Sequence, residues 1–132
     1  MNTSRNTQHK RGLASIEMAL LLPIFMLLLI GIMDVGRLYW IQSVVRDAAF
    51  EGVRAAILHE STNSQIESIV TQELLSGGIN QSSTVGISDR QASQPVTIEV
   101  SVPFEFFVID SLIPSIDGPT NISAAAVMIH ER

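Results

Sequence analysis

Apolar residues are concentrated in one long run near the start of the chain. From Leu13 to Met33, Glu17 is the only residue with a formal charge. A helix rises about 1.5 Å per residue, so a run of this length spans roughly 30 Å, the thickness of the hydrocarbon core of a membrane. The pattern therefore predicts one transmembrane helix over residues 13–33, which Pro23 would allow to kink.

The helical pattern continues beyond this run. Apolar and small side chains recur three and four positions apart from Ile41 to Ile57, with polar ones mainly on the other side. We therefore expect one helix over about residues 13–58, in which 34–58 is an amphipathic extension. Its stripe of small residues fits close packing, either on the chain's own C-terminal part or on the helices of other subunits. The expected packing face consists of Val45, Ala48, Ala49, Gly52, Val53 and Ala56.

Residues 59–132 are expected to form a small head. A helix should begin at a cap on Asn63 or Ser64 and end before Gly77–Gly78. Residues 79–95 are rich in turn formers and predict a loop with at most a short strand. Residues 96–109 alternate like a strand, in which Pro103 indicates an edge or a break, and residues 121–131 resemble a second strand that pairs with it.

The predicted fold class is therefore α+β. A long N-terminal transmembrane and stalk helix carries a small head, which contains a short helix and an antiparallel strand pair. A head of this size has a limited core, so we expect it to lean on the long helix for stability.

Charge is divided unevenly along the chain. Residues 1–12 carry Arg5, Lys10 and Arg11 and no acid, a charge of +3, whereas residues 13–132 hold 13 acids against 5 bases, a charge of −8. An acidic body argues against nucleic-acid binding. The basic stretch before the apolar run predicts a cytoplasmic N-terminus and an extracytoplasmic head.

The sequence offers no candidate active site. It contains no cysteine, and His9, His59 and His130 stand apart without metal-ligand spacing. A phosphate-binding glycine loop is also missing from the sequence. We therefore expect neither an enzyme nor a protein that holds a cofactor or a metal ion.

Glu17 needs its own explanation. The apolar run is longer than that of a secretory signal, and MDVGRLYW follows it in place of a small-residue cleavage site. A permanent anchor explains the run and its basic flank, but not an acid that is costly to bury in lipid. Cutting the bond between Gly12 and Leu13 would create an α-ammonium four residues before Glu17. Pairing of that amine with the acid, in one chain or between neighbours, would relieve the cost of burying both charges.

Three short motifs resemble one known family. They are KRGLASIE at Lys10–Glu17, DVGR at Asp34–Arg37 and RDAAFEGVRAAI at Arg46–Ile57. The first is similar to the processing site of type IV prepilins, where glutamate is the fifth residue after glycine. Together they resemble the N-terminal part of TadE-like proteins, the minor pilins or pseudopilins of the tight-adherence (Flp pilus) machinery. The resemblance covers about Lys10–Leu58.

The resemblance implies site residues, partners and a location. A prepilin peptidase would remove residues 1–12 by cutting between Gly12 and Leu13, behind the basic Lys10 and Arg11, and Glu17 would set the register between subunits. Implied partners are that peptidase, other pilin or pseudopilin subunits, the inner-membrane pilus assembly platform and the lipid bilayer. The implied location is the bacterial inner membrane, with a cytoplasmic N-terminus and a periplasmic head, and a place in an extracellular pilus after processing.

Two other functions stay open at the level of the sequence. One is a permanently anchored extracytoplasmic binding module, whose helix only tethers the head. The other is a pseudopilin of a type II-like secretion system, which shares the cleavage motif. The resemblance of the segment Arg46–Ile57 favours the adherence machinery.

Overall fold

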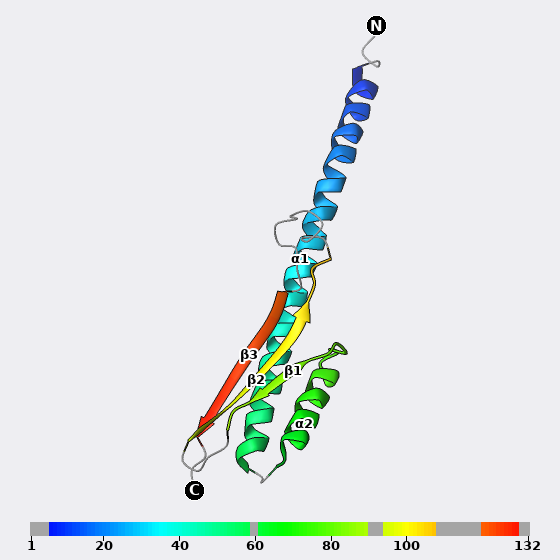
Figure 1. Cartoon of the computed structure of the whole chain (residues 1–132). Coiled ribbons are helices and arrows are strands. Elements are labelled where there is room, and N and C mark those ends of the chain that lie inside the picture. The colour runs from blue at the N-terminus through cyan, green and yellow to red at the C-terminus, as the bar shows by residue number, and fades with distance from the viewer. Residues whose placement is uncertain (1–5, 59–60, 90–93, 108–119, 130–132) are drawn as a thin grey trace.

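The fold consists of one long helix and a small α+β head. The computed structural model describes the backbone of residues 6–58, 61–89, 94–107 and 120–129, and their side chains except at 6–13 and 58. The predicted α+β fold with a stalk helix is confirmed (Figure 1). The elements in chain order are α1 (Asn6–Leu58), α2 (Asn63–Ser76), β1 (Thr84–Ile87), β2 (Pro95–Phe104) and β3 (Thr120–Ile129).

Helix α1 is continuous over 53 residues and passes through Pro23 without a break in its assignment. It ends at Leu58, as the periodicity predicted, and begins at Asn6, seven residues before the expected start. Within the described residues, it is the one helix long and apolar enough to cross a membrane. An apolar run and an amphipathic stripe therefore share one helix.

Helix α2 follows after a short connection and is closed at both ends by local hydrogen bonds. Its N-cap is Thr62, not Asn63 or Ser64, because Thr62 and Gln65 form a reciprocal capping box. The Thr62 N–H donates to Gln65 Oε1 at 2.9 Å. At the other end, Gly78 adopts a φ of 82°, a conformation that glycine allows without strain. The predicted stop at Gly77–Gly78 is thus confirmed.

The three strands form one antiparallel sheet in the order β1-β2-β3. The expected pair is β2 and β3, which run side by side from Pro95 opposite Ile129 to Phe104 opposite Thr120. The short strand β1 adds a third member and pairs only with residues 98–101 of β2. Pro103 lies beyond that stretch, where β2 has a single neighbour, so a proline is compatible with an otherwise central strand.

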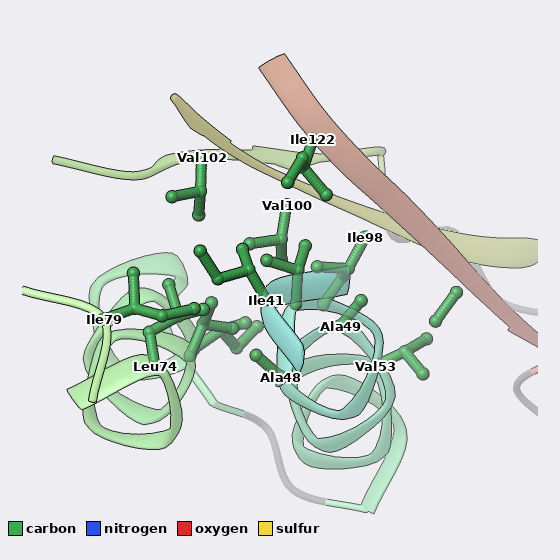
Figure 2. Close-up of a cluster of buried hydrophobic side chains, with 14 of the residues drawn as sticks. Ile41, Ala48, Ala49, Val53, Leu74, Ile79, Ile98, Val100, Val102 and Ile122 are labelled. Carbon is green, nitrogen blue, oxygen red and sulfur yellow. The ribbon is translucent and has the colours of Figure 1, made fainter. Parts of the chain in front are cut away.

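The core lies between two layers, with α1 and α2 on one side and the sheet on the other (Figure 2). Alternate residues of β2 from Val96 to Phe104 are buried, as expected for a strand with one face on a core. The buried apolar residues of α1 are Ile41, Val45, Ala48, Ala49, Val53 and Ala56; those of α2 are Ile66, Val70 and Leu74.

Candidate functional site

The N-terminal half of α1 stands clear of the head. We call residues 14–33 the bare half of α1: every side chain in this range except Gly31 is exposed, and nearly all are apolar. Figure 1 shows this part projecting beyond α2 and the sheet. Its 20 residues rise about 30 Å, which matches the hydrocarbon thickness of a bilayer. The bare half therefore has the length and the surface of a single membrane span.

Glu17 is exposed near the start of the bare half. Among the described residues, no basic side chain pairs with it. The residues predicted to form the cleavage site, Lys10 to Leu13, lie within the α1 helix, and their side chains are outside the described part of the chain. Leu13 and Glu17 are four positions apart in this helix, so they lie on one face about 6 Å apart along the axis.

The C-terminal half of α1 is covered by the head. We call residues 34–57 the docked half. All six residues of the predicted packing face (Val45, Ala48, Ala49, Gly52, Val53 and Ala56) are buried there against α2 and the sheet. A Cβ on Gly52 would lie 2.7 Å from Val70 Cγ2 of α2. Of the two alternatives for this face, the structure shows packing on the chain's own head.

The boundary between the halves carries a polar cluster. Asp34 is 1% exposed, and its Oδ1 accepts a hydrogen bond from the Phe107 N–H at 3.2 Å. Arg37 donates through Nη2 to the Glu105 carbonyl at 2.8 Å. Its guanidinium carbon lies 4.8 Å from the ring centre of Phe104 and 4.3 Å from that of Phe107. Asp34 and Arg37 of α1 therefore contact the end of β2 and the residues that follow it. We call Asp34, Arg37, Phe104, Glu105 and Phe107 the clamp.

A second contact ties the same region of α1 to the end of α2. Trp40 Nε1 donates to the Gly77 carbonyl at 3.1 Å. Val44 also packs so closely on Gly77 that a Cβ at that position would collide with it. Both contacts need the helix stop at Gly77–Gly78 to lie directly against α1. They explain why Trp40 is held in place while most of its ring remains exposed.

The clamp was not predicted from the sequence. Asp34 and Arg37 lie three positions apart on one helix, and hydrogen bonds of both side chains reach the backbone of residues 105–107. The available signals were the aromatic run FEFF at 104–107 and a carboxylate directly after an apolar span. Neither signal identifies its partner, because the two segments lie about 70 residues apart.

Comparison with protein families supports the three motifs noted along α1. A family model described as TadE-like protein matches residues 12–54, about a third of the chain. No curated protein and no solved structure matches the chain. The resemblance to TadE-like proteins is therefore confirmed over this segment, which begins at Gly12 and includes Glu17 and Arg37. At the family level, the match supports a Tad pilus-related minor pilin.

Proposed function

We propose, on the premise that residues 12–54 form a TadE-like segment, that this protein is a minor pilin or pseudopilin of a Flp-type pilus. In this proposal it is a substrate of a prepilin peptidase and not itself an enzyme. After the cut between Gly12 and Leu13, it takes part in assembling or initiating the pilus. Its partners are other pilin subunits and the inner-membrane assembly platform.

The observation that carries this proposal is the division of α1. The apolar face of the docked half is buried within the chain, whereas the bare half leaves apolar side chains exposed on all sides. Lipid can cover that surface in the membrane, but a subunit that leaves the membrane needs the helices of its neighbours. The bare half, and not the predicted face at 45–56, is therefore the surface we assign to subunit packing.

Glu17 gives this packing a register. An acid in lipid costs up to about 2.5–3.5 kcal/mol at mid-membrane and less near the interface. The α-ammonium of a processed Leu13 would lie about one helical turn away, so it can pair with Glu17 of the same chain or of a neighbour. A pair between neighbours fixes how far one helix is displaced along the other.

The orientation follows from the charges on either side of the span. Lys10 and Arg11 precede it, and the acidic head follows it. Basic residues stay on the cytoplasmic side of a membrane. We therefore place the N-terminus in the cytoplasm of a bacterium, where a prepilin peptidase of the inner membrane can reach Gly12, and the head in the periplasm.

The test is the N-terminus of the protein extracted from membranes. Coexpression with an active prepilin peptidase should give a chain that starts at Leu13, as read by intact mass and N-terminal peptide sequencing. Coexpression with an inactivated peptidase is the matched control and should leave residues 1–12 attached. A leader retained in the presence of the active enzyme would overturn the proposal and leave an anchored binding module as the better account.

A further inference from the structure

We propose that the membrane-proximal end of the head is seated in the interface of the outer face of the bilayer, with Phe107 as its lipid contact. This inference requires that the bare half spans the membrane, and the outer face is the side on which the proposed function places the head. It does not depend on cleavage at Gly12 or on a place in a pilus. The proposed contact surface consists of Phe107 from the head and of Tyr39 and Trp40 from α1.

The contacts of Phe107 with α1 place it close to the membrane span. Because α1 is one continuous helix, the position of any contact on it gives that contact's distance from the membrane span. Phe107 meets α1 at Asp34 and Arg37, which immediately follow the bare half. Arginine side chains on a helix lean toward its N-terminus, here toward the membrane. The Phe107 ring therefore lies at the end of the 30 Å span and not above it.

The Phe107 side chain is largely exposed. Phe107 is 74% exposed, one of the highest values among the large apolar side chains described. The neighbouring Phe104 is 1% exposed, and it contacts the same guanidinium. The clamp thus buries one ring in the head and holds the other outward. Tyr39 and Trp40, also largely exposed, lie within two turns of the same level.

The chemistry of the contact surface suits the membrane interface. Tyrosine and tryptophan are enriched at the level of lipid headgroups, because each has an apolar ring and a polar N–H or O–H. Tyr39 and Trp40 are of this kind, and Phe107 adds an apolar ring that lies on the Arg37 guanidinium. All three follow directly on the apolar surface of the bare half. The Asp34 carboxylate at this level is buried and accepts a hydrogen bond from the Phe107 N–H, so this acid is not exposed beside the ring.

The outward position of the Phe107 ring depends on contacts that hold it there. Its N–H is bonded to Asp34, and its ring lies on the Arg37 guanidinium, which is itself bonded to the Glu105 carbonyl. A flexible loop would let the ring turn back onto the protein to reduce its exposure. These contacts fix it outward, which is unfavourable in water and favourable in the membrane interface.

The experiment uses three phenylalanines at three heights as fluorescent depth probes in the full chain. In a Trp40→Phe background, Phe25→Trp, Phe107→Trp and Phe50→Trp each introduce the only tryptophan. Phe25 lies within the bare half, and Phe50 is exposed on the docked half, about 20 Å beyond Arg37 along the helix. Each variant is reconstituted in phosphatidylcholine vesicles whose acyl chains carry bromine either near the ester or near the terminal methyl.

The expected result is a graded response. The Phe25→Trp emission should be quenched by the deep bromines, and Phe107→Trp should lose roughly half of its emission to the shallow ones, as an interfacial residue would. Phe50→Trp should respond to neither. Circular dichroism of each variant checks that the helices and the sheet are retained.

Three results would overturn the inference. If Phe107→Trp responds as weakly as Phe50→Trp while Phe25→Trp is quenched, α1 spans the bilayer but the head stands off from it. A blue-shifted emission of Phe107→Trp without quenching would show that protein covers the ring instead. Loss of quenching at Phe25→Trp as well would remove the premise that the bare half is inserted. None of these results bears on the processing of the leader.

Discussion

The bare and docked halves of α1 belong to one helix but require different surroundings. In the docked half, Val45 and Val53 are fully buried by the head, and beyond Asp34 and Arg37 the polar residues lie mainly on the opposite side. The bare half exposes leucines, isoleucines, methionines and Phe25 around its whole circumference. An amphipathic stripe can be satisfied within one small protein, whereas an apolar cylinder requires lipid or other helices. Head stability and assembly should therefore be separable by substitution.

The largest expected effect on stability is at Phe104. Its ring is buried in the head and meets the Phe106 ring edge-on, with 4.8 Å between the ring centres. It also contacts the Arg37 guanidinium. Phe104→Ala should lower the free energy of unfolding of the head by about 4 kcal/mol, because a large core cavity is left. Urea unfolding in nanodiscs, followed by circular dichroism, measures this change.

The matched control for Phe104 lies in the bare half. Phe25 is 65% exposed and has no part in the core of the head. Phe25→Ala should leave the unfolding of the head unchanged. Equal destabilisation by the two variants would mean that the halves of α1 do not act independently.

A smaller effect is expected at Gly52, where α1 packs closely on α2. Gly52→Leu places a side chain against Val70 and Ile98, so it should destabilise the head by roughly 2–3 kcal/mol. Gly31→Leu is the control, since a Cβ at Gly31 meets nothing within 4 Å. The same urea titration compares them. A Gly52→Leu protein as stable as the parent would show that the α1–α2 contact is looser than the structure describes.

The smallest effect should come from Arg37 of the clamp. Arg37→Ala removes a guanidinium that contacts two aromatic rings and a backbone carbonyl, a loss of about 1–2 kcal/mol. Arg46→Ala, on the exposed side of the same helix, should change stability by less than about 0.5 kcal/mol. Thermal unfolding of both variants in nanodiscs gives the comparison. If Arg37→Ala and Arg46→Ala lower the stability equally, the contacts of Arg37 do not stabilise the head.

Regular features of the sequence predicted most of the fold. The periodicity to Ile57 gave the C-terminal end of α1, and the alternation from Val96 gave β2. Both signals are local: each depends on which side chains share a face, and burial of that face follows. The spacing of Gly12 and Glu17 led to the candidate cleavage and register site, which stays a prediction; the family match covers both residues.

The features that sequence did not predict depend on tertiary contacts. A short strand was allowed within residues 79–95, but the bounds of β1 depend on its pairing with β2, because its four residues sit among turn formers. The choice of Thr62 as the cap depends on Gln65 reaching back to it. The partner of Arg37 is a segment about 70 residues away. No periodicity carries that information.

The most direct test of the central claim compares two glutamates of α1 in a piliated bacterium. Glu17 lies in the bare half, and Glu51 is exposed on the docked half. Counting surface pili in cells that carry Glu17→Gln should show a loss of about tenfold or more, since an amine left unpaired in lipid costs more than 1.4 kcal/mol. Glu51→Gln should assemble pili normally. Normal piliation with Glu17→Gln would contradict the assignment of Glu17 as the residue that registers neighbouring subunits.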